Sequence, residues 1–472
     1  MGRSSKMLYA NKFMFFQPEK MGFFQLFKVL FGSELHNKDF VQFLGFIIVD
    51  ERFYHKWLLF FSLLVQKFLH SIASLLKCIG DILESFLNPQ APNNYNVFML
   101  VLNILRGQEL VNKDSAHYVS IMGHLDKRVG FDNSIKREDP NKYNATLSIM
   151  ASKVSYENKA FFQSIVVDRW KMELVDCRDY WNDYQEKATT QGFILLDKRE
   201  EDDTYVVAFR GTEPFDADAW STDIDFSWLE LPNFGKTHAG FMKALGLQIE
   251  LERNIVGWPK EIENDERPPR AYYAIRDLLK NRLEANNKAN FIVTGHSLGG
   301  ALAILFPAVL MLHDETFLLE RLQGVYTFGQ PRVGDKTFAN YMKQNLKHYQ
   351  IKYYRFVYCN DIVPRLPFDN KFMMFQHFGI CLYYDRTYKG QKMVEEPNKN
   401  YFSWKETIPM RVNAFWELVR SFTIVHKYGA ECQEGRLLKI FRLLGLLIPG
   451  LPAHITQDYV NVTQLGFFSH LD

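Results

Sequence analysis

A serine flanked by glycines is the first feature of this sequence that could carry chemistry. Residues 291–306 read FIVTGHSLGGALAILF, so the pentapeptide around Ser297 separates a short apolar run from a long run of small and apolar residues. A strand, a tight turn and a helix in this order form a nucleophile elbow, which holds a serine hydroxyl at the carboxyl edge of a sheet. The sequence therefore predicts that Ser297 is a nucleophile.

A serine nucleophile also needs hydrogen-bond donors for the oxyanion that forms during the reaction. One predicted donor is the backbone N–H of Leu298, directly after the serine. A second is predicted in YVVAFRGTEP, where a strand ends at Phe209 and the chain turns through Gly211 to Thr212. The N–H and hydroxyl of Thr212 are expected to face the oxyanion. The alternative is an ordinary hairpin end with a structural arginine.

Alternating strands and helices are expected to position these groups. Paired strands are predicted at 192–197 and 204–209, and helices at 270–286 and 298–312. Further strand-like apolar runs are 290–294, 325–328, 353–358 and 380–384. Strands and helices that alternate around a buried sheet predict an α/β fold.

Four motifs of the chain occur in one order: FRGTEP, THAGFMKAL, VTGHSLGGALA and YTFGQPRVGD. They resemble the class 3 lipases, the fungal-type triacylglycerol lipase family, over about residues 145–465. The hydrophobic N-terminal extension, YCNDIVPRLP and GLLIPGLPAHITQDYVN resemble the plant oil-body lipases still more closely. The resemblance implies an α/β-hydrolase fold with a central mixed sheet. It also implies a Ser-Asp-His hydrolase with a mobile lid that acts on acylglycerols at an oil–water interface.

The acid of such a triad is predicted to be Asp361. This residue follows the strand-like run that ends at Tyr358, and it matches the NDxVPxLP pattern of the family. Asp335, in VGDKTF, is the rival. Its position favours a cap on the next helix.

The base is predicted to be His454. The histidines after Asp361 are His377, His426, His454 and His470. His454 follows IPGLP, and the family order places the histidine last in the domain. The interval from Asp361 is longer than in fungal-type relatives, which an insertion at about 390–440 explains. His377 directly precedes the run GICLYY, which favours a structural role.

A lid is predicted at about 213–237, because in the family the lid follows the oxyanion loop and carries a tryptophan. Phe215 and Trp220 stand there among acidic residues. Apolar side chains that cover a site in water can turn outward against oil. The alternative is a surface loop with chance aromatics.

Composition limits the possible partners. The chain has 472 residues, a net charge of +2 and 47% hydrophobic residues, which exclude extended disorder and any strong attraction to nucleic acid. The five cysteines are scattered without metal-binding spacing, which favours free thiols in a reducing compartment. Neither a metal nor a cofactor is predicted.

The N-terminal 1–110 are predicted to be a hydrophobic helical region that associates with a lipid droplet or membrane. Polar residues at spacings of three and four trace one narrow stripe along a helix from Ser62 to Asn88. The remaining faces, with Leu63, Phe68 and Leu75, are expected to contact lipid without spanning a bilayer. The alternative is a helix buried in a protein core. A connecting segment at 111–144 and a lipase domain at 145–472 would follow.

Together these expectations describe a triacylglycerol lipase at the cytosolic surface of lipid droplets, working through an acyl-enzyme. Two alternatives remain open. One is a phospholipase A1 or galactolipase of the same fold, which differs in the head group of its substrate. The other is a non-catalytic droplet coat or tethering protein.

Overall fold

The computed structural model describes residues 8–31, 40–44, 53–88, 112–130, 139–198, 202–250, 255–262, 267–367, 375–399, 401 and 404–466. Most of the predicted linker at 88–96 and the candidate His470 lie outside the described residues.

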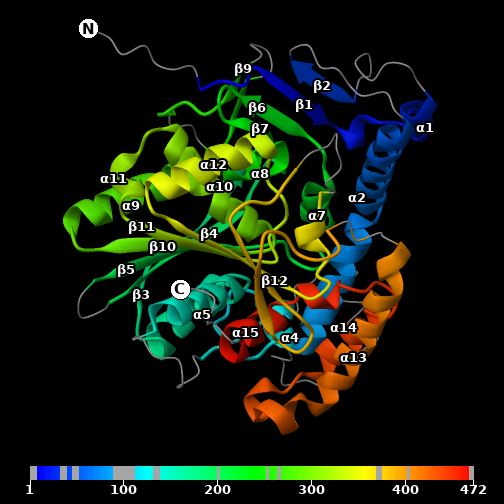
Figure 1. Ribbon diagram of the computed structural model, residues 1–472, viewed down its shortest axis with the longest axis vertical. Coiled ribbons are helices and arrows are strands. Elements are labelled where there is room, and N and C mark those ends of the chain that lie inside the picture. Colours follow the sequence, from blue (N-terminus) through cyan, green and yellow to red (C-terminus); the bar gives the residue numbers. More distant parts are fainter. Residues whose placement is uncertain are drawn as a thin grey trace.

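An eight-stranded mixed sheet forms the centre of the molecule (Figure 1). In spatial order its strands are β14 (Gly390–Met393), β13 (Ile380–Tyr384), β12 (Lys352–Tyr358), β11 (Leu322–Phe328), β10 (Asn290–His296), β5 (Thr204–Phe209), β4 (Lys187–Asp197) and β3 (Glu173–Asn182). The strands from β5 to β13 run parallel, whereas β3, β4 and β14 are antiparallel to their neighbours. Every predicted strand lies in this sheet, and the predicted α/β class is confirmed.

Both faces of the sheet are buried, which explains why its central strands carry apolar residues at successive positions. In β5, Tyr205, Val207 and Phe209 point into one hydrophobic cluster. Val206 and Ala208 point into the cluster on the opposite face. The period of two residues along a strand produces this division.

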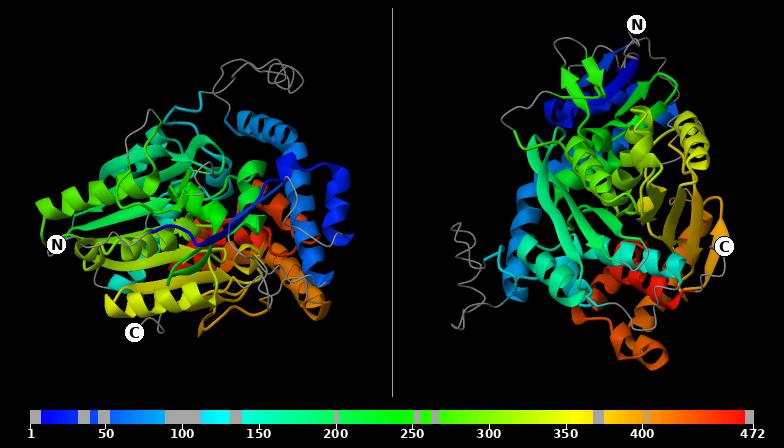
Figure 2. Two further views of the ribbon diagram at one scale, coloured as in Figure 1. Left: turned by 90° about the horizontal axis from the view of Figure 1, so that it is seen from above. Right: turned by 90° about the vertical axis from the view of Figure 1, so that its left-hand side faces the viewer.

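Helices cover the two faces as separate layers (Figures 1 and 2). One layer contains α8 (Ala239–Leu245), α9 (Ala271–Ala285), α10 (Leu298–Leu312), α11 (Thr316–Leu319) and α12 (Lys336–His348). The other contains α5 (Pro140–Val154), α6 (Lys159–Gln163), a π-helix (Ser164–Arg169) and α15 (Thr456–Leu465). The helices predicted at 270–286 and 298–312 correspond to α9 and α10.

The N-terminal region adds two strands to the predicted helices. β1 (Lys12–Phe16) and β2 (Val41–Leu44) join β6 (Trp228–Leu231) and β7 (Gly235–His238) in a second sheet of order β2-β1-β6-β7. The sequence of β1 alternates, so Phe13 and Phe15 enter the main core while Met14 enters a separate N-terminal cluster. The second half of the segment predicted as a lid is therefore the β6–β7 hairpin. A short hairpin of β8 (Gln248–Glu250) and β9 (Ile255–Gly257) lies nearby.

Helices α1 (Phe23–Phe31) and α2 (Phe53–Leu87) form one side of the molecule, at the right of Figure 1. The predicted polar stripe of α2 faces the protein: Ser62 and Gln66 are 3% and 1% exposed. The outer face is apolar, with Phe68 and Leu75 about three-fifths exposed. Leu63, however, is fully buried against β1 and α1, so the expectation that it contacts lipid is wrong. Within the described residues, Leu59–Leu87 is the one helix long and apolar enough to cross a membrane.

A pair of helices occupies the segment predicted as an insertion. They are α13 (Trp404–Tyr428) and α14 (Arg436–Leu444), which pack against each other below α2 in Figure 1. Buried ion pairs join the pair to α15: Arg442 contacts Glu434 and Asp458 at 2.8 Å, and Arg420 contacts Asp458 at 2.7 Å. The segment 404–448, which comprises α13, α14 and the turns that follow them, is called the C-terminal hairpin below.

Candidate active site

Ser297 stands on the turn between β10 and α10. Its backbone has φ 59° and ψ −131°, a conformation that costs on the order of 1–3 kcal/mol in a non-glycine residue. The turn leaves no room for a side chain two residues before the serine, at Gly295, or two residues after it, at Gly299. A Cβ on Gly295 would lie 2.1 Å from Gly299, and a Cβ on Gly299 would lie 2.1 Å from the Phe209 carbonyl oxygen. The strained elbow predicted from the pentapeptide is therefore present.

Three side chains from separate parts of the chain form a line of hydrogen bonds. The Ser297 hydroxyl lies 2.7 Å from Nε2 of His454, in a 3-10 helix (Pro452–His454). Nδ1 of the same ring lies 2.8 Å from Oδ2 of Asp361, after β12. A carboxylate only accepts, so Nδ1 carries the proton and Nε2 accepts from the serine. This arrangement allows the imidazole to take a proton from the serine hydroxyl.

Asp361 is fully buried and has two further donors. The backbone N–H of Val363 donates to Oδ1 at 2.9 Å, and the hydroxyl of Tyr459 donates to Oδ2 at 2.5 Å. Burial and the nearby charge of Asp361 hold the pKa of Tyr459 well above its usual value, so the phenol remains a donor. The sequence analysis did not identify Tyr459. Its position in the first turns of α15, shortly after the histidine, was the only available signal.

His296 links the base to a second tyrosine that the sequence analysis also missed. Its Nε2–H donates to the backbone carbonyl of His454 at 2.8 Å, which leaves Nδ1 to accept from the Tyr156 hydroxyl at 2.8 Å. Burial, followed by the neighbouring His454 ring, holds the pKa of His296 well below its usual value. A neutral His296 therefore fixes the backbone that carries His454.

The two predicted oxyanion donors border the serine. Leu298 begins α10, and N–H groups in a first helical turn have no acceptor within the helix. The loop before Thr212 lies against the nucleophile, because a Cβ on Gly211 would lie 3.1 Å from Cβ of Ser297. Thr212 and Leu298 line one small cavity of about 30 Å³, which is enough for a water-sized group.

The rival residues have other partners. Asp335 caps α12, with its carboxylate accepting from the Phe338 N–H at 2.8 Å. His377 is bound to the Pro364 carbonyl and lies 3.6 Å from Glu396. His426 is exposed near the end of α13. Of the four candidates within the described residues, His454 is the one that hydrogen-bonds to the serine.

Helix α7 (Ala217–Ile224) closes the site. The ring of Trp220 lies 6.4 Å from that of His454, edge to face. Ser297 and His454 are only 1% and 7% exposed. The described structure is thus a closed form, in which an ester could reach the serine only after α7 moves.

Helix α2 holds α7 at both ends. The Ser62 hydroxyl donates to the carbonyl of Ile224 at 2.7 Å, so α2 satisfies an acceptor in the last turn of α7. Before the other end, Phe215 packs against Gly80, where an added Cβ would lie 3.1 Å from that of Phe215. The predicted lid aromatics therefore have different neighbours: Trp220 faces the triad and Phe215 faces α2.

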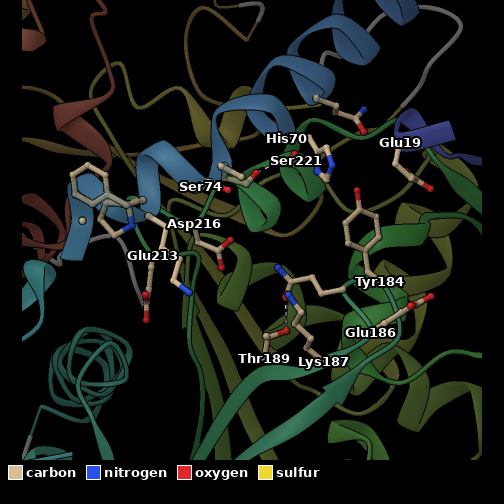
Figure 3. A pocket seen from close by; sticks show the side chains of 18 of the residues that line it. Glu19, His70, Ser74, Tyr184, Glu186, Lys187, Thr189, Glu213, Asp216 and Ser221 are labelled. Carbon is tan, nitrogen blue, oxygen red and sulfur yellow. Dashed lines mark hydrogen bonds between the residues drawn. The ribbon is translucent and has the colours of Figure 1, made fainter. Parts of the chain in front are cut away.

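A polar cavity of about 860 Å³ separates the middle of α2 from the domain. In Figure 3, Ser74 of α2 lies above Asp216 of the oxyanion loop, and His70 lies above Tyr184. Tyr184, Lys187 and Thr189, from the turn and strand after β3, line another wall. The inward polar stripe of α2 thus meets polar groups along its length, which avoids the cost of burying it against apolar residues.

Comparison with known proteins agrees with the geometry. The family model described as "Lipase (class 3)" matches residues 206–371. The chain is 40% identical to the triacylglycerol lipase OBL1 of Nicotiana tabacum, over 87% of this chain and 84% of that protein. It is 38% identical to the protein of the same name from Arabidopsis thaliana, over 98% and 97% of the two chains. The corresponding protein of Ricinus communis is 34% identical, over 95% and 94%.

Proposed function

The chain belongs to the class 3 lipase family of ester hydrolases, with an α/β-hydrolase fold, and from this premise we propose that it hydrolyses acylglycerols at the surface of lipid droplets. The observation that carries the proposal is the line of hydrogen bonds from Ser297 through His454 to Asp361. The relatives named as triacylglycerol lipases support this substrate class. Family membership sets aside the non-catalytic alternative.

In the proposed mechanism, Ser297 attacks the ester carbonyl while His454 takes its proton. Asp361 orients the ring and stabilises its charged form, and His454 then protonates the leaving alcohol. The N–H groups of Leu298 and Thr212 stabilise the oxyanion. Water, activated by His454, releases the fatty acid from the acyl-enzyme and restores the serine.

We assign the lid to α7 and the loop before it, at 213–227. The β6–β7 hairpin is excluded from the moving part because β6 pairs with both β1 and β7. Movement of α7 would uncover the triad and turn Trp220 away from His454. Such a change is favoured where the displaced apolar side chains meet oil instead of water.

The droplet location rests on the outer face of α2. Phe61, Phe68 and Leu75 are 53%, 58% and 61% exposed, while the polar side of the helix contacts the domain. A helix held near both ends by its own domain would lie on a lipid surface, and it would not span a bilayer. Replacing these three residues with Asp should move a fluorescent fusion protein from droplets to the cytosol. An unchanged distribution would contradict this location.

Fatty-acid release from parallel emulsions of triacylglycerol, diacylglycerol, phospholipid and galactolipid tests the substrate class. The purified protein should act fastest on the acylglycerols, and Ser297→Ala should be inactive on all four. Faster release from phospholipid or galactolipid would assign the chain to the alternative activity. Equal release by Ser297→Ala would overturn the serine mechanism.

A further inference from the structure

The C-terminal hairpin buries a cluster of charged side chains and exposes many large apolar ones. Glu417, Glu434 and Arg442 are 4%, 1% and 1% exposed. The exposed side chains include the large apolar residues Ile408, Val412, Phe415, Trp416, Phe422, Ile440, Leu443, Leu444, Leu447 and Ile448. Helices at a water-facing surface have the opposite arrangement, with polar residues outward. The outer face of the hairpin is therefore suited to an apolar environment.

The buried charges give the hairpin a fixed orientation. Arg442 donates to both oxygens of Glu434 and to Asp458, and Asp458 lies on α15 four residues after His454. Breaking such a buried network is costly, because a charge would remain unpaired in the interior. The hairpin is thus a rigid part of the domain that carries the triad.

The hairpin and α2 lie on the same side of the molecule (Figures 1 and 2). Leu83 of α2 and Leu437 and Phe441 of α14 pack on one apolar cluster, which also receives Phe215 from the loop before α7. The hairpin and α2 therefore meet beside the lid. Exposed surfaces with many large apolar side chains mark sites of interaction with membranes or proteins.

The charges around the hairpin face favour a lipid surface. Lys405, Arg411, Lys427 and Arg436 are exposed, against one exposed carboxylate, Glu431. Cations beside an apolar face contact anionic phospholipid head groups, while the aromatic and aliphatic side chains enter the acyl layer.

We propose that the C-terminal hairpin is a second lipid-docking element, which binds a phospholipid-coated oil surface together with α2. This inference rests on the proposed function and deepens it. Two docking elements that meet beside α7 would fix the orientation of the enzyme, with its lid towards the oil. The N-terminal helices alone would leave rotation about α2 unrestricted.

Flotation with artificial droplets of triolein coated with phosphatidylcholine and phosphatidylserine tests the proposal. The variant combines Phe415→Glu, Phe422→Glu and Leu447→Glu, all at exposed positions and away from the ion pairs. We expect its partition onto droplets to fall at least tenfold, with unchanged hydrolysis of a soluble short-chain ester. The matched control is Val167→Glu, which charges another exposed apolar residue beside the outer strand β3, and it should float like the unmodified protein.

The outcomes separate this inference from the proposed function. Equal flotation of the triple variant and the unmodified protein, with soluble-ester activity intact, would overturn the hairpin inference alone. Failure of the unmodified protein to bind droplets or hydrolyse triolein would overturn the proposed function as well. A dimer in lipid-free solution that the triple variant converts to a monomer would show that the face binds a second copy, which would also overturn the lipid assignment.

Discussion

The contact between Ser62 and α7 predicts that a single hydroxyl restrains the lid. In the closed form this buried hydroxyl donates to the Ile224 carbonyl at 2.7 Å and accepts from Nε2 of Gln66 at 2.9 Å. Ser62→Ala removes both hydrogen bonds. In the closed form, loss of the bond to α7 leaves the Ile224 carbonyl without this donor, at a cost of about 1–3 kcal/mol. After α7 opens, water can satisfy the Ile224 carbonyl, so the change destabilises mainly the closed form.

A closed form weakened by about 1.4 kcal/mol is tenfold less favoured relative to the open form. Ser62→Ala should therefore raise kcat/KM for a monomeric, soluble ester roughly tenfold. Its rate on a triolein emulsion should change less than twofold, because the lid is already open there. The measured quantity is the rate on the triolein emulsion divided by the rate on the soluble ester. This ratio should fall about tenfold.

Two further variants make the test specific. Ser71→Ala is the matched control, since Ser71 donates to the Lys67 carbonyl within α2 and is exposed. It should leave the ratio unchanged. Gly80→Ala acts at the other end of α7, where the new methyl must displace Phe215, and it should change the ratio in the same direction as Ser62→Ala. Unchanged ratios in both Ser62→Ala and Gly80→Ala, with native helical content, would refute the idea that α2 restrains the lid.

Three other predictions concern the triad and its surroundings. His454→Ala should lower kcat by roughly 10⁴-fold, and adding Ser297→Ala should cause no further loss. His377→Ala should keep most of the activity. An active His454→Ala beside an inactive His377→Ala would invalidate the choice of base. Tyr459→Phe removes a hydrogen bond to a charged carboxylate, so kcat should fall roughly tenfold at constant KM, and an unchanged kcat would exclude a positioning role. Burial raises the pKa of Asp225, which follows α7, from 3.8 to about 6. The native state therefore binds this proton more tightly than the unfolded state does. Stability is lost as pH rises from about 4 to above 6. The free energy of unfolding of Asp225→Asn should therefore rise relative to that of the unmodified protein as pH increases, by up to about 3 kcal/mol at pH 7. A difference in Tm between the two proteins that stays constant from about pH 4 to 7 would contradict this pKa.

The sequence was sufficient for features that depend on local pattern. Runs such as YVVAF are apolar at successive positions because both faces of the strand are buried, and the elbow follows from glycines that the tight turn requires. Asp361 and His454 were identified by motif and order along the chain. Tyr459 and Tyr156 were not, since their hydrogen bonds join residues 98 and 140 positions apart and no local pattern records them. The spacing of polar residues predicted the stripe on α2 but not its direction, because periodicity describes a helix without its neighbours. Leu63 was misplaced for the same reason.

The direction of that stripe connects lipid binding to opening of the site. Helix α2 contacts α7 with its polar side and presents its apolar side outward, so one rigid element would meet both the lid and the oil. Fully burying an exposed Phe or Leu contributes about 1.5–3 kcal/mol, so Phe61, Phe68 and Leu75, each a little over half exposed, would together gain roughly 3–5 kcal/mol in lipid. That gain is at least as large as the roughly 1–3 kcal/mol assigned to the Ser62 hydrogen bond with α7. A small shift of α2 towards lipid is therefore energetically sufficient to release α7, whereas in water the same shift would gain nothing. The closed, buried triad and the outward apolar helix would then be two parts of one device that makes hydrolysis faster at an oil surface than in water.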